Sequence, residues 1–197
     1  KYLGDPDFYK VPIKKITSKD YAKNILSNIK IGKATPANDI YPGKHFIKES
    51  HETTHFSVAD KSGNVVSMTY TLNSTFGSKV VIKDTGILMN NEMDDFSAAP
   101  GIPNQFNLLG AEANQITPFK RPLSSMTPTI VLKDEELFFT TGSPGGSRII
   151  SAVLQSILNI IDFEMDLEEA TFAKRIHHQW YPDILEFEFS LDEEINM

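Results

Sequence analysis

The chain has 197 residues, with 19 basic and 26 acidic side chains and a net charge of −7. This acidic balance disfavours binding to a nucleic-acid backbone, because such binding needs basic side chains that replace condensed counterions. The sequence contains no cysteine, which excludes disulfides, thiolate metal sites and a cysteine nucleophile, and no apolar run reaches the roughly 20 residues of a membrane-spanning helix.

The first 52 residues predict one helix and a linker. Ser18 can cap a helix whose apolar face carries Tyr21 and Ile25, and Gly32 ends it. Residues 33–52 are polar and contain two prolines, so they bury little apolar surface. We therefore place an organisational boundary near residue 52.

Two β-hairpins are expected after this boundary. Alternating side chains and turn residues predict one hairpin from residues 55–58 and 65–71, and a second from residues 129–132 and 137–141. The residues between them, 97–128, include five prolines and predict loops.

The last quarter of the chain predicts helices. An apolar stripe predicts one helix over residues 150–161, and a shorter helix is expected over 166–174. Residues 184–189 predict a late strand. Strands followed by helices indicate a layered α+β architecture.

Two adjacent threonines, Thr53 and Thr54, follow Glu52 at the mouth of the first hairpin. Threonine is common in strands, so one interpretation is β-propensity alone. The alternative is an N-terminal nucleophile, in which the bond before the threonine breaks and the freed α-amine acts as the base for its hydroxyl. An α-amine suits this task because its pKa lies near ~8. The pattern by itself leaves both interpretations open.

A glycine-rich turn, residues 142–147, precedes the longer predicted helix. It can be an ordinary helix-starting turn. It can also form an oxyanion hole, because Gly145 and Gly146 allow a ligand to approach backbone N–H groups at a helix N-terminus.

An acidic segment and a pair of serines are candidate binding groups. The acidic segment, which contains Glu92 and Asp95, is either a solvated loop or a site for a cationic group such as an ammonium. Ser124 and Ser125 can donate hydrogen bonds to a carboxylate, or can supply turn polarity. The spacing of an EF-hand is absent, so calcium is a weaker option.

The histidines do not predict a metal site. His51 and His55 are four residues apart but lie in a segment that favours extended structure, and His177 and His178 are adjacent. We expect neither a metal nor a cofactor.

Five segments together resemble the gamma-glutamyltranspeptidase family in order and spacing, and the resemblance covers essentially the whole chain. The segments are TTHFSV at residues 53–58, TYTLN at 69–73, NNEMDDF at 90–96, RPLSSMTP at 121–128 and GSPGGSRI at 142–149.

The resemblance implies an N-terminal-nucleophile hydrolase with an αββα sandwich, made as a precursor that cuts itself into two subunits. The cut would fall between Glu52 and Thr53. Residues 1–52 would then end the large subunit, and residues 53–197 would form most of the small catalytic subunit, cut short at its C-terminus. The remainder of the large subunit would be a partner of this chain.

The resemblance also implies the chemistry. Thr53 would attack the γ-glutamyl amide of glutathione or a related compound, Thr71 would hydrogen-bond and orient its hydroxyl, and Gly145 and Gly146 would form the oxyanion hole. The acyl-enzyme would pass its γ-glutamyl group to water or to an amino acid or peptide.

The substrate's two charged groups would be held separately. By the resemblance, Asn73, Glu92 and Asp95 would bind the α-amino group, whereas Ser124 and Ser125 would bind the α-carboxylate.

Residues 100–110 correspond to the family's lid loop, where Phe106 stands in place of a tyrosine found in many members. The family also implies a periplasmic or secreted protein. Two alternatives stay open: a related acylase, such as a cephalosporin acylase or a poly-γ-glutamate depolymerase, and a non-catalytic fragment. The acidic pair disfavours acylases whose substrates lack an α-ammonium.

Overall fold

A computed structural model describes residues 3–36, 52–106, 108–181 and 183–188. The chain divides into two compact units, each described by itself. The first unit consists of Lys1–Lys48, Glu92–Ser124 and Trp180–Asp183. The second unit consists of Glu49–Asn91, Ser125–Gln179 and Ile184–Met197.

The first predicted hairpin is confirmed in the second unit. Strands β1 (Thr54–Ala59) and β2 (Val65–Tyr70) are antiparallel, with Thr54 opposite Tyr70. The turn between them is stabilised by Asp60, whose Oδ1 accepts hydrogen bonds from the backbone N–H groups of Ser62 and Asn64. An aspartate that bonds to the backbone two residues ahead is typical of such turns.

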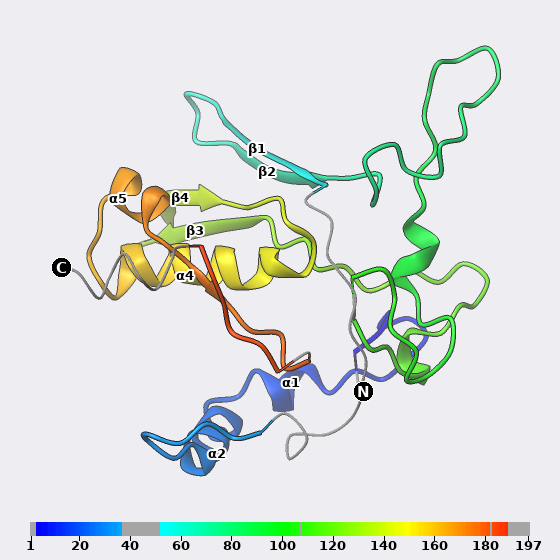
Figure 1. Ribbon diagram of the computed structural model, residues 1–197. Helices are drawn as coiled ribbons and strands as arrows, with labels where there is room; N and C mark the ends of the chain where they lie inside the picture. Colours follow the sequence, from blue (N-terminus) through cyan, green and yellow to red (C-terminus); the bar gives the residue numbers. More distant parts are fainter. Residues whose placement is uncertain (1–2, 37–51, 107, 182, 189–197) are drawn as a thin grey trace. The chain divides into compact units, whose positions relative to one another are not determined.

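The second predicted hairpin is also confirmed. Strands β3 (Thr129–Lys133) and β4 (Glu136–Thr141) are antiparallel, with Thr129 opposite Thr141. Ser67 of β2 places its hydroxyl 3.4 Å from the carbonyl oxygens of both Thr129 and Thr141. The two hairpins of this unit therefore lie side by side (Figure 1).

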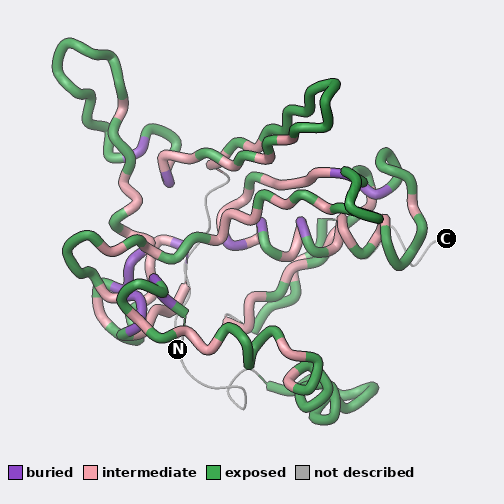
Figure 2. The backbone as a smooth tube through the Cα atoms, turned by 180° about the vertical axis from the view of Figure 1, so that it is seen from behind, coloured by how far each residue is buried: buried purple, intermediate pink, exposed green. Residues whose placement is uncertain are grey.

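The second unit has its core where helix α4 (Ile149–Ile161) meets the second hairpin. Ile149 and Val153 of α4 and Phe139 of β4 are buried (Figure 2). Helix α5 (Leu167–Phe172) begins at a capping box, in which Asp166 and Glu169 each accept a hydrogen bond from the other's backbone N–H. Both helices match their predictions within a few residues.

The predicted late strand is shorter than expected. Strand β6 is Glu186–Phe187, and it pairs with β5 (Ile176–His177), a strand that the sequence did not predict. The predicted strand was placed over residues 184–189, and residue 189 lies outside the described part.

The described residues of the first unit include two helices and two 3-10 turns. Helices α1 (Ile13–Ile16) and α2 (Lys19–Asn28) lie near its start, and the hydroxyl of Ser18 caps α2 as predicted. The 3-10 turns are η1 (Glu92–Asp95) and η2 (Glu112–Asn114). Its buried apolar side chains are Phe96, Phe106 and Ala113.

An ion pair ties the beginning of the first unit to a segment far along the chain. Both carboxylate oxygens of the buried Asp5 accept hydrogen bonds from the Arg121 side chain, at 2.6 and 3.0 Å, and Oδ2 also accepts one from the Arg121 backbone N–H. These bonds hold the pKa of Asp5 well below its usual range. The segment that leads to Ser124 is therefore anchored at Arg121.

Within the described ranges, no helix has both the length and the apolar composition needed to cross a membrane.

Ile149 provides a test of the core beside the glycine-rich turn. It is only 1% exposed, so truncation to alanine should reduce the free energy of unfolding by roughly 2–5 kcal/mol and truncation to valine by roughly 0.5–1.5 kcal/mol. Chemical denaturation measures both values. Equal, small effects of the two substitutions would show that Ile149 is not packed as described.

Candidate active site

Two threonine hydroxyls meet at the carbonyl oxygen of Glu52. The Thr53 hydroxyl donates a hydrogen bond to this oxygen, and the Thr71 hydroxyl lies 3.4 Å from it in a donating geometry. The Glu52 side chain accepts a further hydrogen bond from the Thr75 hydroxyl. Thr71, which was predicted to orient the Thr53 hydroxyl, therefore lies near it. In this structure both hydroxyls face the carbonyl oxygen of Glu52.

Asn73 sets the direction of the Thr71 hydroxyl. Its backbone N–H donates to the Thr71 oxygen at 2.9 Å, so the Thr71 proton is left to point at Glu52. Asn73 is buried and has a φ of 76°, a left-handed conformation that asparagine tolerates better than most residues. Its side-chain amide donates to the carbonyl of Asn91 at 3.3 Å, which closes the loop that follows β2.

The glycine-rich turn requires its two glycines. Gly145 has a φ of 123° and Gly146 a φ of 56°, both in the region that glycine adopts most readily. The turn runs into a 3-10 segment, η3 (Gly146–Arg148), which continues directly as α4. Gly145 and Gly146 therefore lie at the N-terminal end of a continuous helical segment, where the helix dipole favours negative charge.

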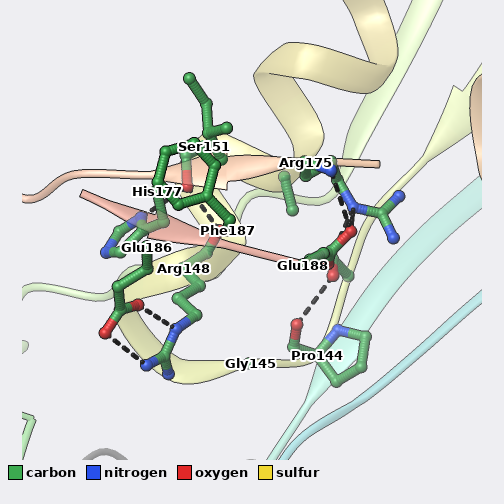
Figure 3. Close-up of a pocket in the computed structure, with 12 residues that line it drawn as sticks. Pro144, Gly145, Arg148, Ser151, Arg175, His177, Glu186, Phe187 and Glu188 are labelled. Carbon is green, nitrogen blue, oxygen red and sulfur yellow. Dashed lines mark hydrogen bonds and ion pairs between the residues drawn. The ribbon is translucent and has the colours of Figure 1, made fainter. Parts of the chain in front are cut away.

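A pocket of about 360 Å³ lies beside this turn and is lined by residues of η3, α4 and the β5–β6 pair (Figure 3). Arg148 donates two hydrogen bonds to Glu186, at 2.8 and 3.1 Å, and the hydroxyl of Ser151 lies 2.7 Å from Nδ1 of His177. These polar side chains thus pair across the pocket. The β5–β6 pair thereby holds the first turn of α4, and with it the glycine-rich turn.

His55 links the strand that carries the candidate nucleophile to the glycine-rich turn. Its Nδ1 lies 2.9 Å from the Thr69 hydroxyl and its Nε2 lies 3.2 Å from the Ser57 hydroxyl. A Cβ added to Gly142 would lie 2.1 Å from the imidazole ring. The imidazole ring therefore packs against Gly142, and burial lowers the pKa of His55.

The acidic pair of the first unit consists of Glu92 and Asp95. Glu92 and Asp95 stand at the two ends of η1 and are both half-buried, with a hydrogen bond between their side chains. Burial, together with that contact, raises the pKa of Asp95 to about 7, and burial also raises the pKa of Glu92.

The remaining predicted residues are divided between the units. Ser124 belongs to the first unit and Ser125 to the second, and neither lies in a helix or strand. Phe106 is a buried core residue of the first unit, in the segment predicted to be a lid.

Sequence reasoning gave no role to His55 or to the buried Asn114. Both residues stand out through contacts with residues far apart in the chain, and the spacing of motifs along the sequence does not reveal such contacts.

Comparison with known proteins gives one consistent result. A family model described as Gamma-glutamyltranspeptidase matches residues 1–197. A glutathione hydrolase proenzyme of Escherichia coli (strain K12) is 57% identical over 188 residues, which are 95% of this chain and 32% of that relative. The chain thus spans about a third of the length of that relative.

A second relative is similar in length to this chain. A protein of Arabidopsis thaliana named putative inactive glutathione hydrolase 4 is 42% identical over 191 residues, which are 94% of this chain and 98% of that protein.

Two solved structures share the fold. A gamma-glutamyltranspeptidase mutant of Helicobacter pylori is 54% identical with a TM-score of 0.68, over 73% of this chain and 78% of that one. A cephalosporin acylase of Bacillus halodurans is 27% identical with a TM-score of 0.70, over 91% of this chain and 30% of that one. The predicted α+β fold of an N-terminal-nucleophile hydrolase is thereby confirmed.

The packing of His55 against Gly142 predicts a coupled pair of substitutions. Gly142→Ala should displace the imidazole ring and lower the thermal midpoint of unfolding, because the new methyl group has no space. In the double variant with His55→Ala, the clash is relieved, so the loss should be smaller than the sum of the two single losses. Strictly additive losses would contradict the contact.

The raised pKa of Asp95 predicts that Asp95→Asn stabilises the protein at high pH. The folded state holds the Asp95 proton up to about pH 7, whereas an unfolded aspartate loses it near ~4. The stability contributed by this proton is therefore present below pH 4 and is lost as pH rises through 7. The asparagine variant should have the higher thermal midpoint at pH 8, and the advantage should shrink toward pH 4.

Glu112→Gln is the matched control for this experiment, because it removes one exposed carboxylate from the same unit. An Asp95→Asn variant that is less stable than the wild-type protein at pH 8 would contradict the prediction.

Proposed function

Because the chain belongs to the gamma-glutamyltranspeptidase family, we propose that it supplies the nucleophile and most of the substrate site of an enzyme that transfers γ-glutamyl groups from glutathione. The observation that carries the proposal is the meeting of the Thr53 and Thr71 hydroxyls at the Glu52 carbonyl. The name proenzyme, given to the related glutathione hydrolases, supports a precursor that is cut before it acts.

The first step is the cut between Glu52 and Thr53. The Thr53 hydroxyl oxygen attacks the Glu52 carbonyl carbon, and the hydroxyl proton passes to the departing amide nitrogen, which leaves an ester. Water then hydrolyses the ester and releases the Glu52 carboxyl group. The Thr71 hydroxyl stabilises the charge that develops on the Glu52 oxygen, since it already donates toward that atom.

The cut changes what Thr53 can do. Its nitrogen is an amide before the cut and an α-amine after it. The free amine, with a pKa near ~8, can accept the hydroxyl proton and activate the oxygen as a nucleophile. We propose that Thr71 then hydrogen-bonds the Thr53 hydroxyl, because the carbonyl that it faced in the precursor has left.

In the second step, Thr53 attacks the γ-amide carbonyl of the substrate. The proton from the hydroxyl reaches the leaving amine through the α-amine, and an ester between Thr53 and the γ-glutamyl group forms. We place the negative oxygen of this reaction at the N–H groups of Gly145 and Gly146, which lie where a helical segment begins. Water, or the amine of an amino acid or peptide, then takes the acyl group.

Recognition of the γ-glutamyl group would need partners for both of its charged groups. We assign the α-ammonium to Asn73, Glu92 and Asp95, and the α-carboxylate to Ser124 and Ser125. The burial that raises the pKa values of Glu92 and Asp95 supports the first assignment, because an ammonium ion beside the two carboxylates would stabilise their charged forms.

The subunit organisation and the location of the protein are proposed from its membership of the family. Residues 1–52 would end a large subunit whose remainder completes the enzyme, and residues 53–197 would belong to the small subunit. We also propose that the complete protein works in the periplasm or is secreted.

One observation favours a second, non-catalytic role. The relative from Arabidopsis thaliana that matches along nearly its whole length is named putative inactive. The two roles are separated by N-terminal sequencing of the complete gene product: an enzyme should give a fragment that begins Thr-Thr-His-Phe, whereas an inactive protein should remain one uncut chain.

Substitutions of the two threonines test the mechanism. Thr53→Ala should block both the cut and the release of aniline from a γ-glutamyl-anilide. Thr71→Val removes only a hydroxyl group and should slow the cut about 100-fold, the typical cost of one oxyanion donor, while Thr71→Ser should retain most of the rate. Electrophoresis over time measures the cut, and efficient cutting by Thr53→Ala would exclude Thr53 as the nucleophile.

A further inference from the structure

Asn114 is a buried polar residue to which the proposed reaction gives no role. It is the last residue of η2 and is 4% exposed. Its side-chain nitrogen donates to the backbone carbonyl of Asp95 at 2.7 Å, and its side-chain oxygen accepts from the backbone N–H of Leu123 at 3.0 Å. Both ends of the amide are therefore used, by two separate segments of the first unit.

The orientation of this amide is fixed by its partners. The Asp95 carbonyl can only accept a hydrogen bond and the Leu123 N–H can only donate one, so an asparagine satisfies both in one orientation alone. The backbone carbonyl of Asn114 also accepts a hydrogen bond from Ser97 at 2.9 Å. Asn114 is thus bonded to the residues on both sides of Phe96, namely Asp95 and Ser97.

The two segments that Asn114 joins carry opposite halves of the proposed substrate site. Asp95 is assigned to the ammonium group, and Leu123 directly precedes Ser124, which is assigned to the carboxylate. The second segment is fixed again at Arg121 by its bonds to Asp5. The amide of Asn114 is therefore a spacer of defined length between two recognition groups of one compact unit.

We propose that Asn114 is a positioning residue that sets the distance, within the first unit, between the ammonium-binding carboxylates and the carboxylate-binding Ser124. Asn114 thereby selects acyl groups that bear an ammonium and a carboxylate on the same carbon. This inference rests on the function proposed above and deepens it.

The selection follows from two-point recognition. An acyl group with both charged groups on one carbon fits only when its two partners are held at the matching separation. An acyl group that lacks the ammonium, such as glutaryl, makes only one of the two contacts and gains nothing from the correct separation. A change in the spacer should therefore weaken the first substrate more than the second.

Two variants of Asn114 test the spacer in the complete gene product that contains this chain. Asn114→Asp keeps the acceptor for Leu123 but loses the donor to Asp95, whereas Asn114→Gln keeps both groups and moves them by one methylene. Val153→Ala is the control, because it removes buried apolar contact from α4 in the other unit and tests the effect of lost stability alone.

The measurement is kcat/KM for a γ-glutamyl-anilide and for a glutaryl-anilide. For both Asn114 variants, we expect a fall of about tenfold for the γ-glutamyl substrate, comparable to the loss of one hydrogen bond. The fall should come mainly from a higher KM, and the glutaryl substrate should change less than about twofold. Val153→Ala should change both substrates by the same factor.

Two results would overturn the spacer role or the function on which it rests. If the ratio of the two substrates stays at its wild-type value in both Asn114 variants, the spacer role is wrong and the proposed function stands. If Asn114→Asp fails to fold, the ratio of the two substrates in Asn114→Gln alone tests the spacer role. If the wild-type protein releases no aniline from the γ-glutamyl substrate, the proposed function falls and this inference falls with it.

Discussion

The arrangement at the Glu52 carbonyl is the constraint on which the rest of the candidate site depends. One oxygen faces two hydroxyl groups, and the second of them, from Thr71, also accepts a hydrogen bond from the N–H of Asn73. Asn73 adopts a left-handed conformation in the turn that follows β2. The geometry at the bond before Thr53 is thus determined by the end of the neighbouring strand in the same hairpin.

Stability and binding oppose each other at the acidic pair. Burial raises the pKa values of Glu92 and Asp95, so the folded protein retains a proton there that an unfolded chain would release at neutral pH. Two carboxylates so placed destabilise the ligand-free protein as pH rises. The same burial makes the pair a strong partner for an ammonium ion, since little water competes with it.

The sequence predicted those parts of the fold that depend on neighbours in the chain. Both hairpins and the cap at Ser18 arise from alternation, turn residues and local hydrogen bonds. The sequence did not predict β5, because its pairing with β6 is set by contacts across a loop and with α4. It likewise gave no sign of the contact between His55 and Gly142, which joins two hairpins and depends on their packing.

Several asparagine side chains connect separate segments by hydrogen bonds, and the chemistry of the amide group explains why. Asn73 bonds to the Asn91 carbonyl, Asn91 both donates to and accepts from Ser74, and Asn114 bridges Asp95 and Leu123. An amide can donate and accept at once without carrying charge. An aspartate at these joints would lose the donor and add negative charge near Glu92 and Asp95. Under the proposed function, uncharged bridges would leave the acidic pair as the anionic group for a substrate ammonium, so different residues would set the geometry of the site and its charge.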